Sequence, residues 1–99
     1  MLHPECPVED EGLSSSSDLT ENTDSSRARL DTPEEHGMSG GWVPAVNDRE
    51  QYLEVDLGSD QGVGGVVTQG RDRHDDWVTH YTVRYRRDGE SNWRPIYQV

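Results

Sequence analysis

Short segments in which apolar and polar residues alternate constrain the fold of this chain more than any other feature. Three aliphatic residues alternate with two acids across residues 53–57, and two tyrosines and a valine alternate with polar residues across 81–86. A period of two places successive side chains on opposite faces of a strand, so each segment is predicted to be a half-buried strand with an apolar inner face. No stretch has the period of a helix, and the sequence therefore predicts an all-β protein.

Two further strands follow from the same reasoning. Residues 63–69 are rich in valine and predict a strand, in which a Gly-Gly pair marks a bulge or a close approach of another backbone segment. The Asp-Gly pair at 88–89 is a turn signal that leads from the tyrosine-bearing strand into a last strand at 93–97. Pro95 lacks an N–H group and confines that strand to a sheet edge or a bulge. Together these segments predict an antiparallel β-sandwich or barrel.

The first part of the chain is acidic. Residues 1–41 carry ten acids and two arginines, a net charge of −8 (2 − 10), while apolar residues are concentrated from Trp42 onward. Such a composition predicts an irregular, loop-rich segment. The whole 99-residue chain has a net charge of −11, which disfavours nucleic acids and anionic membranes as partners because it repels their phosphates. No apolar stretch approaches the roughly 20 residues that a membrane-spanning helix needs.

Three blocks of sequence carry a resemblance to a known family. Residues 41–48 read Gly-Trp-Val-Pro-Ala-Val-Asn-Asp, residues 51–58 read Gln-Tyr-Leu-Glu-Val-Asp-Leu-Gly, and residues 66–71 read Val-Val-Thr-Gln-Gly-Arg. With further matches at 27–30 and 77–89, the chain resembles discoidin domains, also called coagulation factor 5/8 type C domains, over residues 6–99.

The resemblance implies a discoidin-type, galactose-binding-like jelly-roll barrel of about eight antiparallel strands, of which this chain holds about five. It divides the chain into an acidic lead-in at 1–12 and a discoidin domain at 13–99 that lacks its C-terminal strands, with a first strand at 13–17. In the family, a cysteine near the start of the domain pairs with one at its end. Cys6 is therefore a disulfide candidate whose partner is absent from this chain.

Discoidin domains are secreted and cell-surface binding modules, so the resemblance implies an extracellular or cell-surface location, although residues 1–4 do not begin a signal peptide. The predicted function is an extracellular recognition module that mediates cell adhesion or binds a cell-surface or matrix protein within a larger multidomain protein. A carbohydrate-binding, lectin-like domain is the first alternative and a phospholipid-binding domain the second. Lipid-binding members carry apolar loop tips flanked by basic residues, whereas the corresponding loops here are acidic. No catalytic sequence motif is present, and an enzyme is not predicted.

Ligands of the family bind at loops at one end of the barrel, and three such loops are expected here, at 18–26, 32–47 and 71–76. The predicted ligand-binding residues lie in these loops or beside them: Asn47, Asp48, Arg71, Asp72, His74, Asp75 and Trp77.

The Asn47-Asp48 pair has two interpretations. It could contact a ligand or calcium, because hard oxygens suit Ca²⁺, or it could form a turn that begins the next strand, which we favour. The 71–77 cluster is either a charged, partly aromatic recognition loop or a solvated hairpin loop. No catalytic or metal site and no cofactor are predicted. Trp42 and Trp93 are expected to be structural, whereas Trp77 could take either role.

Overall fold

The structure of the chain is a computed structural model that describes residues 8–59, 61–63 and 65–96. The disulfide candidate Cys6 lies outside the described residues. The secondary structure consists of short strands and single-turn 3₁₀ helices, in chain order: η1 (Asp10–Gly12), β1 (Leu13–Ser15), η2 (Glu21–Thr23), η3 (Ser25–Arg27), β2 (Leu53–Val55), β3 (Arg84–Tyr85) and β4 (Arg94–Pro95).

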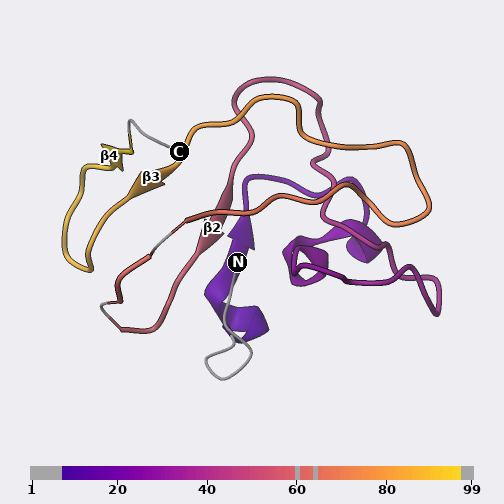
Figure 1. Cartoon of the computed structure of the whole chain (residues 1–99), viewed down its shortest axis with the longest axis horizontal. Coiled ribbons are helices and arrows are strands. Elements are labelled where there is room, and N and C mark those ends of the chain that lie inside the picture. The colour runs from indigo at the N-terminus through magenta and orange to yellow at the C-terminus, as the bar shows by residue number, and fades with distance from the viewer. Residues whose placement is uncertain (1–7, 60, 64, 97–99) are drawn as a thin grey trace.

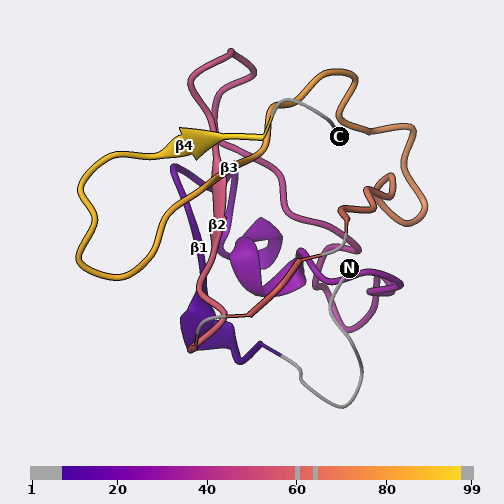
Figure 2. The same cartoon turned by 60° about the vertical axis from the view of Figure 1, so that its left-hand side comes forward.

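The strands β1 and β2 form an antiparallel pair that joins the two halves of the chain (Figure 2). Leu13 lies opposite Val55, and the pairing extends beyond the strands through a hydrogen bond from the Ser16 N–H to the Tyr52 carbonyl oxygen (2.9 Å). The predicted first strand is therefore confirmed, in a shorter form. Leu13 is 7% exposed and, with Val8, is one of two buried apolar side chains among the described residues.

The predicted burial of the 53–57 segment is wrong. Leu53 and Val55 were expected on the inner face, yet they are 37% and 42% exposed, while Glu54 between them is half-buried. The alternation is real, but an apolar face is buried only where another layer covers it. Within the described part of the chain, β2 pairs with β1 alone, in a two-stranded sheet. The alternation of apolar and polar residues therefore predicts this strand but not the burial of its apolar face.

The strands β3 and β4 form a hairpin, as the sequence predicts, although each has only two residues. The predicted burial of the tyrosine-bearing face is wrong, because Tyr81 is 47% and Tyr85 49% exposed. The turn at 88–89 is closed by a hydrogen bond from the Glu90 N–H to the Arg87 carbonyl oxygen (3.1 Å), and Gly89 has φ +85°. Because the Ile96 N–H bonds to the Val83 carbonyl oxygen, the next pair, Arg84 and Pro95, is one that exchanges no ladder hydrogen bonds. Pro95 therefore occupies an edge strand at a position where its missing N–H costs nothing.

The predicted strand at 63–69 is wrong. The described residues of this segment have no strand structure and make no backbone ladder with another segment. A strand requires a hydrogen-bonded neighbour, and glycine is among the residues that form strands least readily. The valines here are exposed: Val63 is 62% and Val67 58% exposed.

The described architecture is thus β-strands and coil, with no long helix. It matches the predicted β-sandwich in part, because the strands form two separate small sheets. The β3–β4 hairpin lies on one side of the molecule, and the helical turns η2 and η3 lie on the other (Figure 1). None of the helices in residues 8–59, 61–63 and 65–96 is long and apolar enough to cross a bilayer.

Candidate functional site

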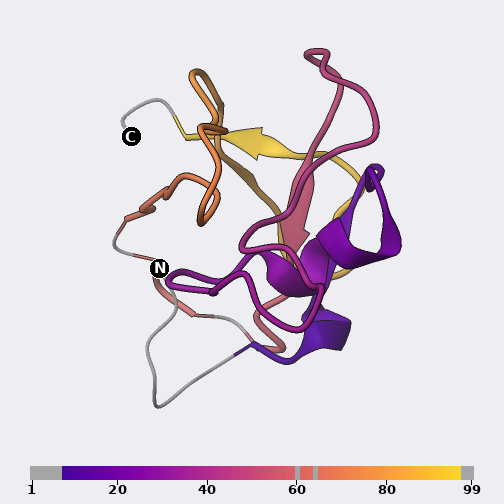
Figure 3. The ribbon, with the colours of Figure 1, turned by 90° about the vertical axis from the view of Figure 1, so that its right-hand side faces the viewer.

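The first and second predicted loops are joined through their backbones. The Leu19 N–H donates to the Val43 carbonyl oxygen (2.8 Å), the Val43 N–H donates to the Thr23 carbonyl oxygen (3.0 Å), and the Ser39 N–H donates to the Asn22 carbonyl oxygen (2.9 Å). Segments about 20 residues apart in sequence therefore share one hydrogen-bonded surface. Figure 3 views the molecule from the side on which these loops lie.

Local polar signals shape the first loop. Thr20 and Thr23 form a reciprocal cap at η2: the Thr20 hydroxyl accepts from the Asn22 N–H (3.2 Å), and the Thr23 hydroxyl accepts from the Thr20 N–H (2.9 Å). Asp24 caps η3 by accepting from the Ser26 N–H (3.0 Å). Such caps satisfy the amide groups that a short helix leaves without partners. The acidic, serine- and threonine-rich composition thus produces an ordered loop rather than an extended one.

Trp42 fixes the start of the first loop. Its Nε1–H donates to the Ser17 carbonyl oxygen and to Asp18 Oδ1, each at 3.0 Å. This supports the structural role predicted for Trp42, since a half-buried indole usually finds a partner for its N–H group. Trp93 has a different environment: it is 41% exposed, and the Arg86 guanidinium lies 4.6 Å from the centre of its ring.

The third loop is closed on itself by Arg71 and Asp76. The Arg71 N–H donates to the Asp76 carbonyl oxygen (2.9 Å), and Arg71 Nη1 lies 3.0 Å from Asp76 Oδ2. A second bond runs from the His74 N–H to the Arg71 carbonyl oxygen (3.3 Å). The loop is therefore a compact turn whose ends meet.

Side chains of the third loop also bind the second loop. Arg71 Nε donates to Ser39 Oγ (3.0 Å), the Glu34 N–H donates to Asp72 Oδ2 (2.9 Å), and His74 Nε2 lies 2.8 Å from Glu34 Oε1. Ser39 is 4% exposed, so the bond from Arg71 reaches a buried hydroxyl. Three contacts between residues more than 30 positions apart thus hold the two loops together.

Gly40 permits this close approach. The Asp72 N–H donates to the Gly40 carbonyl oxygen (3.3 Å), and a Cβ atom added at Gly40 would collide with the Asp72 Cβ. A side chain at this position would therefore force the second and third loops apart.

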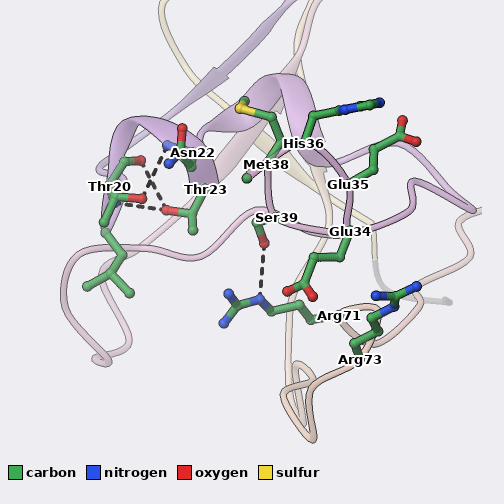
Figure 4. Close-up of a pocket in the computed structure, with 12 residues that line it drawn as sticks. Thr20, Asn22, Thr23, Glu34, Glu35, His36, Met38, Ser39, Arg71 and Arg73 are labelled. Atoms are coloured by element: carbon green, nitrogen blue, oxygen red, sulfur yellow. Dashed lines mark hydrogen bonds between the residues drawn. The ribbon is translucent and has the colours of Figure 1, made fainter.

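A pocket opens where the three loops meet, and we call it the loop pocket (Figure 4). Its volume is about 480 Å³, and its lining comes from all three loops: Leu19, Thr20, Asn22, Thr23, Glu34, Glu35, His36, Gly37, Met38, Ser39, Arg71 and Arg73. A second pocket of about 440 Å³, the side pocket, lies between residues 31–33 and 69–73. Arg71 and Arg73 line both pockets.

Backbone strain is concentrated at these pockets. Among the described residues, Asp31, His36 and Arg73 are the non-glycine residues with a left-handed backbone, with φ of 59°, 52° and 63°. Each of them lines the loop pocket or the side pocket. Strained conformations persist where surrounding contacts over-determine the backbone, and they are frequent at ligand-binding surfaces.

The structure gathers part of the predicted site. Arg71, Asp72 and His74 lie where the second and third loops meet, and all three are engaged in contacts that hold the loops. Asp75 is exposed. Trp77, which is 67% exposed, follows the third loop without lining either pocket, so it is available for contact rather than buried in a core.

Asn47 and Asp48 lie apart from this cluster and line neither pocket. Asp48 Oδ1 accepts hydrogen bonds from the Gln51 side chain and from the Glu50 N–H, both at 2.9 Å. These two bonds, the Gln51 bond first, stabilise the carboxylate and lower the pKa of Asp48 from its ordinary value. This is the Asx turn that we favoured for the pair. Within the described residues, no group of three or more His, Cys, Asp or Glu side chains is arranged to hold a metal ion.

Several residues that build the loop surface escape prediction from the sequence. Glu34 and Ser39 carry no motif, and their importance arises from contacts with residues distant in sequence. Arg73 belongs to the 71–77 cluster but was not named as a ligand-binding residue, although it lines the loop pocket. The available signal was their position within the expected second and third loops.

The arrangement defines a class of protein: a β-strand scaffold that presents a composite loop surface for binding. The sequence profile of the F5/8 type C domain matches residues 12–99, and the chain belongs to this family of discoidin domains. Discoidin domains are binding modules, and their fold is a β-sandwich.

Three relatives illustrate the similarity. The chain is 40% identical to retinoschisin of Takifugu rubripes over 68 residues, and this match covers 69% of this chain and 23% of that protein. It is 39% identical over 67 residues to retinoschisin of Mus musculus, covering 68% and 29% of the two chains. It is 35% identical to hemocytin of Bombyx mori over 85 residues, and this match covers 86% of this chain and 3% of that protein. The chain thus spans less than a third of the length of each of these relatives. No solved structure gives a significant match.

Proposed function

We propose that this chain is an extracellular recognition module, and that it binds a cell-surface or matrix protein as part of a larger multidomain protein. In this proposal residues 13–99 form the discoidin part, and the binding surface is the loop pocket with its rim. Asp75 and Trp77 extend that surface along the third loop.

One observation carries the proposal: loops from three parts of the chain are hydrogen-bonded into a single surface that surrounds a pocket. Loops held by a scaffold are the usual place for binding residues, because they vary without disturbing the strands behind them. The hydrogen bonds between the loops favour one arrangement of the surface, and pre-organised loops lose less entropy on binding.

Apolar surface at the pocket supports a protein partner. Leu19 is 54% exposed, and both Leu19 and Met38 line the pocket. Protein interfaces have an apolar core, in which methionine is enriched, surrounded by a polar rim. The surrounding acids, including Glu21 and Glu35, disfavour an anionic membrane as the partner.

The test compares binding of the 99-residue chain to cultured cells and to cell-free matrix with binding of a Leu19→Ser variant. We expect saturable binding that the variant weakens about tenfold or more, because an apolar anchor is lost. Val63→Ser is the matched control, since Val63 is similarly exposed and lines neither pocket. Equal binding by the two variants would place the site elsewhere.

Treatment of the cells separates the classes of partner. A protein partner is lost after mild proteolysis and survives removal of glycans by glycosidases. Binding that resists protease and disappears with glycosidase would instead establish the lectin-like alternative.

A further inference from the structure

The charged and titratable residues of the loop pocket, and of the loop contacts beside it, include two groups. The first group takes part in the hydrogen bonds described above between the third loop and the second loop: Arg71, Asp72 and His74 on the third loop and Glu34 on the second. Each of these side chains therefore has at least one partner within the chain.

Arg73 and Glu35 form the second group. Both are exposed and line the loop pocket, and within residues 8–59, 61–63 and 65–96 neither side chain makes a hydrogen bond or an ion pair. They are not paired with each other either, and Figure 4 shows the Glu35 carboxylate and the Arg73 guanidinium well apart at the rim. The pocket therefore presents one positive and one negative group that nothing in the described chain neutralises.

The backbone directs Arg73 to this position. Arg73 has φ 63°, a left-handed conformation in the middle of a loop whose ends are tied by Arg71 and Asp76. An arginine there costs more than a glycine would, because its Cβ crowds the backbone. The loop that carries it is nonetheless held rigidly against the second loop through Asp72 and His74.

We infer that the loop pocket recognises a polypeptide segment of mixed charge, in which an acidic side chain meets Arg73, a basic side chain meets Glu35, and an apolar side chain contacts Leu19 and Met38. This inference rests on the proposed function, because it concerns the same surface. A guanidinium pairs with a carboxylate through two parallel hydrogen bonds, which gives the contact a defined direction.

Net charge explains why both signs are needed. A purely acidic segment is repelled by a chain of net charge −11, even though exposed charges act mainly within the Debye length of about 8 Å at physiological salt. A purely basic segment is attracted by Glu35 but repelled by Arg73 at the pocket. Only a segment with both signs gains at each contact, so the pair selects partners as well as binding them.

The experiment uses the 99-residue chain and three synthetic, fluorescently labelled peptides. The first contains one lysine, one leucine and one aspartate separated by glycines, and in each of the others a serine replaces either the lysine or the aspartate. Fluorescence anisotropy is expected to show saturable binding of the mixed peptide that is about tenfold tighter than that of either control peptide.

Charge reversal tests the two residues. R73E and E35R are each expected to weaken binding of the mixed peptide by about tenfold, and the double variant is expected to recover most of it, because a flexible peptide can bind in the reverse direction. Arg84→Glu and Glu11→Arg are the matched controls: they change the net charge equally at exposed positions outside the pocket and should leave binding unchanged. Circular dichroism verifies folding, and the milder R73Q and E35Q replace any variant that unfolds.

Four results would overturn the inference: equal affinity for all three peptides, the same loss of binding in the matched controls, no recovery in the double variant, or binding to phosphatidylcholine vesicles in place of the mixed peptide. These outcomes are separate from failure of the proposed function. If Leu19→Ser weakens binding to cells while R73E and E35R leave peptide binding unchanged, the loop pocket is supported as the binding site and its preference for mixed charge is refuted. If Leu19→Ser leaves binding to cells unchanged, the proposed site itself is wrong.

Discussion

Replacing Arg71 by alanine tests whether this residue holds the loops together. The Arg71 side chain is 18% exposed, and it links the third loop to the second through the buried Ser39 hydroxyl. It also closes the third loop through Asp76. Alanine removes both contacts at once and leaves no group that could replace them.

The two contacts contribute unequally to stability. A hydrogen bond from a charged group to a partly buried hydroxyl contributes about 1.5–3 kcal/mol. The ion pair contributes at most about 1 kcal/mol, because the Asp76 side chain is 58% exposed and solvent screens it. We therefore expect Arg71→Ala to lower the free energy of unfolding by about 2 kcal/mol, which lowers the melting temperature of a domain this small by roughly 10 °C.

The assay is thermal unfolding followed by tryptophan fluorescence and by circular dichroism. Arg73→Ala is the control at a neighbouring arginine, and it should change stability by less than about 0.5 kcal/mol because its side chain makes no contact of this kind in the described chain. Equal melting temperatures for the two variants would refute the assignment of Arg71 as the residue that joins the loops.

Three further predictions follow from burial, charge and pKa. Leu13→Ala should lower the free energy of unfolding by about 2–5 kcal/mol because Leu13 is 7% exposed, and Leu53→Ala should lower it clearly less because Leu53 is 37% exposed. Urea unfolding measures both values, and a larger loss for Leu53→Ala would contradict the observed burial. Vesicles containing phosphatidylserine should not retain the chain at physiological salt, because acids surround the exposed Leu19; saturable co-sedimentation would disprove this. Gln51→Ala should raise the pKa of Asp48 in an NMR titration of its carboxyl group, because it removes the hydrogen bond that lowers this pKa most. The stability that depends on charged Asp48 is present above about pH 4 and is lost as the pH falls through the pKa of Asp48 in the folded protein. An unchanged pKa in the variant would show that the hydrogen bond is absent in solution.

The sequence determined the local features of this protein. The Asp-Gly turn and the alternating strand before it produce the β3–β4 hairpin, and Leu13 begins a strand at the expected place. The Asx turn at Asp48 could also be predicted. Each depends on interactions within a few residues or on the alternation of side chains along a strand, so the sequence contains the necessary information.

Burial could not be predicted in the same way. The alternation at Leu53 and Val55 indicated an apolar face but not whether another layer covers it, and the valines at 63–69 indicated a strand but not whether a neighbouring strand pairs with them. Both outcomes depend on segments elsewhere in space, because burial and sheet pairing are properties of two elements rather than one.

Only the tertiary structure decided how the candidate site is divided between support and recognition. The sequence named Arg71, Asp72 and His74 alike as ligand-binding residues of the 71–77 cluster, and it did not name Arg73 among them. Folding brings Glu34 and Ser39 against that cluster, and their contacts tie Arg71 and His74 to the second loop, while Arg73 lines the pocket without such a contact. Side chains adjacent in sequence differ in their contacts here because the partners lie more than 30 residues away, and such partners are determined only when the chain has folded.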